Sequence, residues 1–307
     1  MYNFKRIMVG LDLTLMDKTL IEYTAFLSYY FRPEKIYFIN VQPDLDIPDE
    51  LRAAFPEFDQ PKDELIKEEL KEKVRTYFGD YQEFDIDCEV IEGSPRREML
   101  HWAHVKNIDL LIAGRKKDLE GSGMVPQQLA RKISCSVLFV PEKVKMTLRD
   151  ILVPVDFSEY CNMALEEAKE ISKIDESVKI HLQHAFDVPM GYSKTGKTEE
   201  EFAEIMEKHA QNRMEKFLSK GGHDQDRMVK IFSYNHDEFS PADIINKVAH
   251  EKEVDLIIIG ARGRTALTAL FLGSVAEKLI KKDSDIPLLV VKHKAKTFSF
   301  WEMLGSI

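Results

Sequence analysis

Apolar residues in this chain form short continuous runs that are separated by stretches with helical spacing. The clearest runs in the second half of the chain are residues 150–155, 178–186, 228–234, 256–259 and 288–292. Short runs rich in branched side chains predict buried strands. Between the first two runs, Ala164, Ala168 and Ile171 recur at helical spacing behind the N-cap candidate Ser158. Five strands joined by four helices indicate a parallel, doubly wound sheet.

The first half of the chain repeats this pattern. The segment KRIMVGLD at residues 5–12 aligns with RDILVPVD at residues 149–156, and IDLLIAG at residues 108–114 aligns with VDLIIIG at residues 254–260. Duplication followed by small changes in loop length explains such a register. We therefore expect an α/β fold with two tandem, doubly wound parallel five-stranded sheets. The expected domains are residues 1–145 and 146–295, followed by an apolar tail at residues 296–307.

A glycine pattern follows the fourth predicted strand of the second copy. Two residues separate Gly260 from Gly263, and nine more lead to Gly273 and Ser274 at the start of a predicted helix. Glycine lets the backbone turn and approach a ligand closely, and a helix N-terminus presents N–H groups to anions. Arg262 adds a positive charge suited to phosphates. A packing-only role for this loop is the alternative interpretation.

This spacing resembles the Gly-x2-Gly-x9-Gly-Ser nucleotide signature of the universal stress protein family. The resemblance covers nearly the whole chain as two tandem domains, and it implies a Rossmann-like, adenine nucleotide alpha hydrolase-like fold that binds ATP without a Walker-type lysine. Asp156, at the end of the first strand, would accept hydrogen bonds from a ribose or base. The residues that the family pattern implies for nucleotide binding are Pro154, Val155, Asp156, Ala185, Gly260, Arg262, Gly263, Gly273, Ser274 and Val275. Any Mg²⁺ would be held mainly through phosphate oxygens, so no metal ligand of the protein is expected.

The first copy departs from the signature. Lys117 stands where the second glycine belongs, the loop to Gly123 is four residues shorter, and Met124 replaces the serine. Lysine adopts a positive φ only at a cost, and methionine offers no hydroxyl. We therefore predict that the first half does not bind ATP and serves as a structural partner. The basic residues 115–117 are either a solvated turn or a local anion site.

Residues 191–198, GYSKTGKT, formally match the Gly-x4-Gly-Lys-Thr pattern of a phosphate-binding loop. Residues 187–190 separate this segment from the preceding strand, and no later strand ends in the aspartate that such enzymes use for magnesium. A flexible linker is the simplest interpretation. The alternative is a lid in which Lys194 or Lys197 folds over bound phosphates.

Composition narrows the function classes. The chain has 43 Lys and Arg against 53 Asp and Glu, a formal net charge of −10, so it lacks the overall positive field typical of nucleic-acid binding. Its apolar runs are far shorter than the ~20 residues of a membrane span. Cys88, Cys135 and Cys161 show no CxxC spacing, which favours a reducing, cytoplasmic location.

Two predictions concern contacts and function. We expect the copies to form a pseudo-dimer through residues 137–140 and 288–291, and the tail to dock on the protein itself or to contact a second subunit or a protein partner. The expected function is that of a cytoplasmic universal stress protein that binds ATP in its second half and acts as a nucleotide-dependent interaction module in stress response. A slow ATPase or phosphotransferase, and a scaffold with an empty site, are the alternatives.

Overall fold

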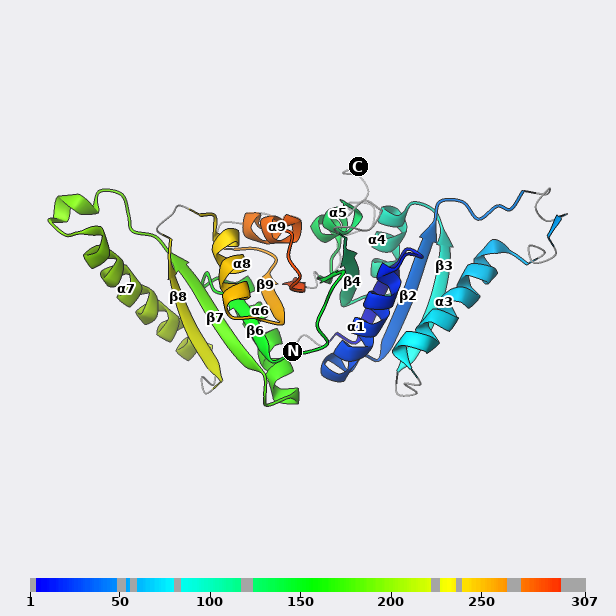
Figure 1. Ribbon diagram of the computed structural model, residues 1–307, viewed down its shortest axis with the longest axis horizontal. Helices are drawn as coiled ribbons and strands as arrows, with labels where there is room; N and C mark the ends of the chain where they lie inside the picture. Colours follow the sequence, from blue (N-terminus) through cyan, green and yellow to red (C-terminus); the bar gives the residue numbers. More distant parts are fainter. Residues whose placement is uncertain are drawn as a thin grey trace. The chain divides into compact units, whose positions relative to one another are not determined.

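The computed structural model of the chain falls into two compact units that meet in sequence between Met146 and Thr147 (Figure 1). The residues that the structure describes are 4–48, 54–55, 60–79, 84–116, 124–221, 227–235, 239–263 and 272–293. Three regions that the sequence analysis named thus lie outside the described residues. They are Lys117, the loop between Gly263 and Gly273 at residues 264–271, and the tail at residues 296–307.

The first unit alternates strands and helices, and all of its paired strands are parallel. Its sheet has the order β3-β2-β1-β4-β5, with α1 packed against α3 and α4 packed against α5. Its elements are β1 (Arg6–Leu11), α1 (Met16–Phe31), β2 (Lys35–Gln42), α3 (Lys62–Phe78), β3 (Asp85–Glu92), α4 (Pro95–Val105), β4 (Leu110–Arg115), α5 (Met124–Lys132) and β5 (Ser136–Pro141).

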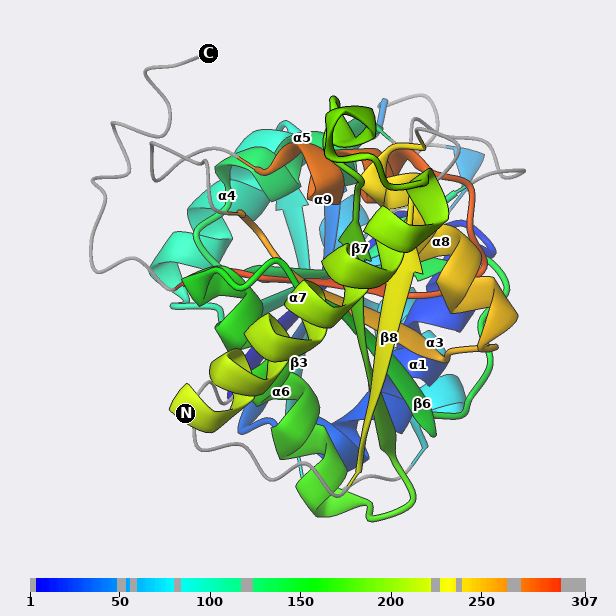
Figure 2. The same ribbon diagram turned by 90° about the vertical axis from the view of Figure 1, so that its left-hand side faces the viewer.

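The second unit repeats this topology, with the sheet order β10-β9-β6-β7-β8. Helix α7 lies against β7 and β8, and α8 packs against α9 (Figure 2). Its elements are β6 (Asp150–Pro154), α6 (Glu159–Ile174), β7 (Lys179–Phe186), the 3-10 helix η2 (Tyr192–Thr195), α7 (Glu199–Lys220), β8 (Met228–Tyr234), α8 (Pro241–Glu251), β9 (Leu256–Gly260), α9 (Ser274–Lys281) and β10 (Leu288–Val291). The predicted pair of doubly wound parallel sheets is confirmed.

The apolar runs form the centre of each sheet. Every residue of β9 and β10 is buried, as the continuous apolar character of strands covered on both faces requires. The outer strands are different, because β3 and β8 are mostly half-buried. On β3, Asp85 and Asp87 pair with Lys35 of β2 at 2.6 and 2.7 Å, and Glu89 pairs with Lys67 of α3 at 3.0 Å.

Side-chain caps start several helices at the predicted residues. The Ser158 hydroxyl accepts a hydrogen bond from the Cys161 N–H at 3.2 Å at the start of α6. Ser240 and Asp243 form a capping box at α8, with Pro241 in its first turn. Among the helices of the described ranges, none is long and apolar enough to cross a membrane.

Candidate nucleotide-binding site

The predicted site residues of the second unit lie at the reversal point of its sheet. The chain runs outward from β6 to β7 and β8, and then returns to β9 on the other side of β6. The strands β6 and β9 are parallel, with Ile151 opposite Leu256, so their carboxyl ends meet at one edge. Ligands of doubly wound sheets bind outside this edge, where the strand order reverses.

Gly263 lies directly against the carboxylate of Asp156. A Cβ atom at position 263 would be 2.6 Å from Asp156 Oδ2, a separation that side-chain atoms do not tolerate. The other carboxylate oxygen, Oδ1, accepts a hydrogen bond from the Ser158 N–H at 3.0 Å. A larger residue at this position would therefore require the Asp156 carboxylate or the loop to move.

The other two glycines join the end of β9 to α6 and α9. A Cβ atom on Gly260 would be 2.6 Å from the carbonyl oxygen of Tyr160 in the first turn of α6. The Gly273 N–H donates a hydrogen bond to the Ala261 carbonyl oxygen at 2.7 Å, which brings the start of α9 beside the end of β9. Gly273 is the N-cap of α9 and supplies no side-chain cap, and the exposed Ser274 is its first residue. Val275 follows and is half-buried.

The guanidinium group of Arg262 is held by Tyr160. Arg262 Nη1 donates a hydrogen bond to the Tyr160 hydroxyl at 2.9 Å, and Arg262 Cζ lies 5.2 Å from the centre of the same ring. The sequence analysis did not identify Tyr160. Its position two residues after the N-cap Ser158 was the available signal, because the first turn of α6 faces the end of β9.

The remaining predicted residues lie around the ends of β6 and β7. Pro154 ends β6 and is buried, and the buried Val155 donates its N–H to the Gln183 carbonyl oxygen at 2.7 Å. Pro154 is opposite Gln183 in the parallel register, so the half-buried Ala185 comes level with Asp156 two residues later. The structure thus gathers all ten predicted residues at the end of one sheet.

Phe157 has a left-handed backbone, with φ of 63°, between Asp156 and the helix cap. Its ring centre lies 4.5 Å from that of His184, 5.8 Å from that of Phe217 and 4.3 Å from Arg213 Cζ. The His184 Nδ1 atom is 2.6 Å from the Val155 carbonyl oxygen. This cluster fixes the turn that carries Asp156, and the sequence analysis missed it because a left-handed phenylalanine is rare.

Cys161 follows the turn but is not a nucleophile. It is 3% exposed, and burial together with the nearby Asp156 charge raises the pKa of its thiol to about 12. The thiol therefore stays protonated at neutral pH, and only the thiolate is a strong nucleophile.

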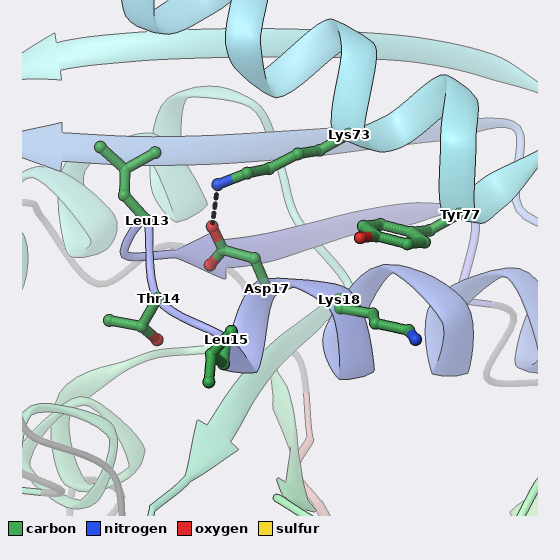
Figure 3. Close-up of a pocket in the computed structure, with 7 residues that line it drawn as sticks. All are labelled: Leu13, Thr14, Leu15, Asp17, Lys18, Lys73 and Tyr77. Atoms are coloured by element: carbon green, nitrogen blue, oxygen red, sulfur yellow. Dashed lines mark hydrogen bonds and ion pairs between the residues drawn. The ribbon is translucent and has the colours of Figure 1, made fainter.

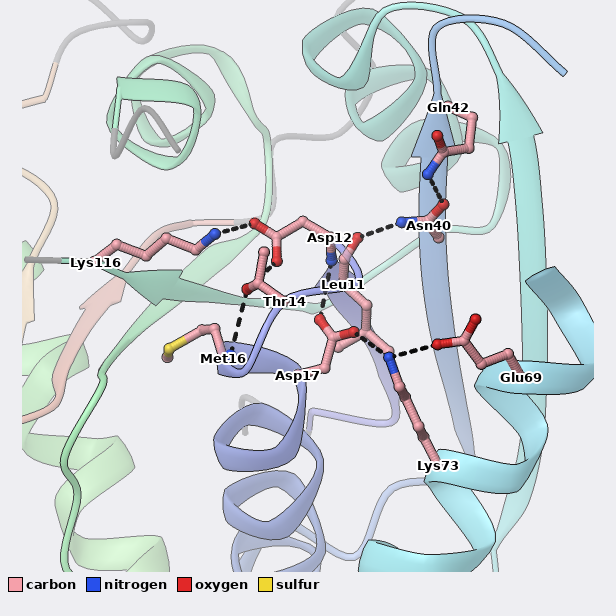
Figure 4. A network of polar contacts seen from close by, with 10 residues as sticks. All are labelled: Leu11, Asp12, Thr14, Met16, Asp17, Asn40, Gln42, Glu69, Lys73 and Lys116. Atoms are coloured by element: carbon pink, nitrogen blue, oxygen red, sulfur yellow. Dashed lines mark hydrogen bonds and ion pairs between the residues drawn. The ribbon is translucent and has the colours of Figure 1, made fainter. Parts of the chain in front are cut away.

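The first unit carries an ion pair at the corresponding place. Asp12, which aligns with Asp156, pairs with Lys116, which aligns with Arg262 (Figure 4). The Thr14 hydroxyl also donates to Asp12 Oδ1 at 2.7 Å. The chain's own ammonium group therefore neutralises the acid of the degenerate copy. Lys116 was expected only in a solvated turn or an anion site, and its pairing with Asp12 was not anticipated.

Residues 191–198 end in a helix cap rather than a phosphate cradle. The Thr198 hydroxyl accepts a hydrogen bond from the Glu201 N–H at 3.2 Å, and the Glu201 carboxylate accepts one from the Thr198 N–H at 2.9 Å. Tyr192 donates to Glu199 at 3.1 Å in the same helix turn. Carboxylates of the chain thus occupy the anion-binding end of α7, and a phosphate there would be repelled.

Carboxylate, histidine and cysteine side chains do not gather into a metal site within the described residues, where no group of three or more is placed to hold an ion. Any divalent ion at this edge of the sheet would need oxygen ligands from a bound molecule or from water.

Known proteins resemble the chain over both of its repeats. The universal stress protein family model matches residues 3–141 and again residues 147–292. Universal stress protein MJ0577 of Methanocaldococcus jannaschii is 34% identical over 163 residues, which cover 48% of this chain and 96% of that protein. Universal stress protein MJ0531 of the same organism is 31% identical over 150 residues, 48% of this chain and 84% of that protein.

A solved structure extends the likeness to both units. The universal stress protein from Archaeoglobus fulgidus covers 96% of this chain and 100% of its own, with a TM-score of 0.63 and 20% identity, which shows a shared fold. The chain belongs to the universal stress protein family and carries two of its domains in tandem.

Proposed function

We propose that the second unit binds ATP at the carboxyl ends of β6 and β9. The observation that carries this proposal is the contact of Gly263 with Asp156, beside which the Gly273–Ala261 hydrogen bond holds the start of α9. A Cβ atom would fill the space between the glycine and the carboxylate. An acceptor for a nucleoside and an uncapped helix N-terminus for phosphates thus lie together.

Each part of the site has a role in this proposal. The Asp156 carboxylate accepts hydrogen bonds from the ribose, with Pro154, Val155 and Ala185 around the base. The backbone at Gly260, Gly263, Gly273 and Val275, the Ser274 hydroxyl and the Arg262 guanidinium contact the ribose and phosphates. A bound Mg²⁺ would neutralise phosphate charge and be held by phosphate oxygens.

The first unit serves as a structural partner in this proposal. Lys116 already neutralises Asp12, so a nucleoside would have to displace an ion pair within the chain. The biological role that follows is a cytoplasmic, nucleotide-dependent interaction module in stress response, in which ATP changes a surface that a protein partner or a second copy contacts.

A matched pair of substitutions tests the site. Denaturing mass spectrometry of the purified chain detects nucleotide that was carried through purification, and calorimetry of the nucleotide-free chain gives the ATP affinity. We expect Asp156→Asn to weaken ATP binding about tenfold, because a hydrogen bond to a charged acceptor is lost. Asp12→Asn, 144 residues earlier, should leave the affinity unchanged. Equal effects of the two substitutions, or no ATP binding at all, would refute the proposal.

Turnover tests the enzymatic alternative. Release of phosphate from ATP above that of a Gly263→Glu control would assign a slow ATPase to the same site. Turnover equal to the control leaves binding as the function.

A further inference from the structure

The first unit contains an open cavity of about 590 Å³ where α1 begins beside α3 (Figure 3). Its walls include Leu13, Leu15, Asp17, Lys18, Lys73 and Tyr77. This volume lies within the range of small-molecule sites. The cavity adjoins the Asp12–Lys116 pair on the side toward α3, because its lining residue Thr14 donates to Asp12 Oδ1 and its lining residue Asp17 accepts the Asp12 N–H at 3.0 Å.

The second unit fills the corresponding space with its own aromatic ring. Leu13 and Phe157 each follow the strand-end aspartate, and both have left-handed backbones, with φ of 62° and 63°. The Phe157 ring lies 4.3 Å from Arg213 Cζ and 5.8 Å from the Phe217 ring, and both of these residues belong to α7. The shorter Leu13 leaves this volume open in the first unit.

The two helices over this space match in register. The residues of α3 and α7 that are buried at equivalent positions, 140 residues apart, are Leu70 and Ala210, Val74 and Met214, and Phe78 and Leu218. The same register places Lys73 at the position of Arg213, and Tyr77 at that of Phe217. The first unit therefore has a cation and an aromatic side chain at these two positions of α3. It lacks the aromatic ring that lies against them in the second unit, because Leu13 stands at the position of Phe157.

The two lysines of the cavity differ in how closely carboxylates pair with them. Lys73 bridges Asp17 at 3.4 Å and Glu69 at 2.9 Å, so this ammonium group is already paired with two carboxylates of the chain. Lys18 is different, because its side chain is 57% exposed, lies 5.6 Å from the centre of the Tyr77 ring and reaches Glu22 only at 3.9 Å. A weakly compensated ammonium group thus stands at the rim of an apolar and aromatic cavity.

We propose that this cavity binds a small aromatic carboxylate. The ring of the ligand takes the place that the Phe157 side chain occupies in the second unit and packs on Leu13 and Tyr77. Its carboxylate pairs with Lys18, and the 80% exposed Leu15 is covered. Aromatic contacts and a charge-assisted hydrogen bond supply the affinity.

Phenylacetate is the probe, added to the full-length chain and followed by amide NMR shifts and calorimetry. Phenylacetamide lacks the charge, and cyclohexylacetate lacks the aromatic face. We expect saturable binding of phenylacetate in the millimolar range or tighter, about tenfold stronger than for either analogue. No saturable binding, or equal binding of all three probes, overturns the proposal.

Substitutions locate the site. Leu13→Phe imports the ring that the second unit accommodates in the same left-handed turn, and it should lower phenylacetate affinity about tenfold or more. Leu15→Glu changes only the exposed rim and should weaken binding by charge repulsion. Lys18→Gln should abolish the preference for phenylacetate over phenylacetamide.

Circular dichroism checks that each variant is folded, and Leu15→Glu decides the test if Leu13→Phe does not fold. Unchanged affinity in folded Leu13→Phe, or in Leu15→Glu when Leu13→Phe is unfolded, overturns the proposal. ATP affinity of the second unit should stay unchanged in all three variants, so this test is independent of the nucleotide site.

Discussion

The ammonium group of Lys116 pairs with the carboxylate of Asp12 at the end of β1. At the matching loop position of the second unit, Arg262 donates to the Tyr160 hydroxyl at 2.9 Å. The same place in the repeat thus carries a lysine that pairs with the strand-end acid in one unit and an arginine that donates to a tyrosine hydroxyl in the other.

Breaking this pair should not create a second nucleotide site. Lys116→Gln removes the ammonium group, but the phosphate-binding glycine and serine of the signature remain absent from the first copy. We expect calorimetry to give one ATP per chain both before and after the substitution. The lost ion pair should lower the free energy of unfolding by at most about 1 kcal/mol. A stoichiometry of two would show that Lys116 alone closes the first site.

Gly263→Val should abolish ATP binding. Its Cβ atom would lie 2.6 Å from Asp156 Oδ2, so either the loop or the carboxylate must move. Gly10→Ala is the control, because it changes a glycine of β1 in the first unit, where the added Cβ would lie 3.0 Å from the end of the Met99 side chain. The affinity of both variants for ATP is measured by calorimetry. Full affinity in Gly263→Val would mean that the contact has no part in nucleotide binding.

Glu167 should make the protein less stable as the pH rises. It is 3% exposed, and burial, with the charge of Glu170 adding, raises the pKa of its carboxyl from 4.5 to about 8. The folded chain then retains a proton that the unfolded chain releases, so the free energy of unfolding falls between these two pH values. Glu167→Gln cannot ionise and should be more stable than the parent above pH 8 by on the order of a few kcal/mol, with no such gain below pH 4.5.

Urea unfolding across this pH range measures the effect. Glu166→Gln is the control, since its side chain is 40% exposed and pairs with Lys169 at 3.3 Å. A pH-independent difference between Glu167→Gln and the parent would contradict the prediction.

Thr198→Ala should destabilise α7 without changing ATP affinity. The substitution removes the hydroxyl of the capping box, a loss of about 1 kcal/mol. Amide hydrogen exchange in the first turns of α7 reports the loss, and Thr195→Ala in the same segment is the control. A tenfold loss of ATP affinity in Thr198→Ala would instead restore the phosphate-loop interpretation. Lys197→Ala tests the lid alternative in the same way.

The fold could be predicted because its signals are local. The runs at β6 and β9 are continuously apolar, and Ser158 and Ser240 precede their helices as caps. The position of Asp156 beside the glycines also followed from sequence, since parallel strands bring their carboxyl ends to one edge. Glu167 could have been found too, because it lies three residues after Ala164 on the apolar face of α6.

The contacts that the sequence analysis missed depend on how separate elements align. The cap Ser158 places Tyr160 in the first turn of α6, but its pairing with Arg262 also depends on how that turn lies against the end of β9. The cavity beside Leu13 depends on a ring that is missing from one copy and on the register of α3 against α1. Positive φ at Leu13 and Phe157 is set by the packing of the whole turn.

The charged outer strand of the first sheet has a consequence for self-association. Strand β3 ends the sheet order, and Asp85, Asp87 and Glu89 line it, with lysines as their partners. A strand from another molecule that added to this edge would have to pack beside these ion pairs and cost them their water, and such charged edges discourage growth into fibrils.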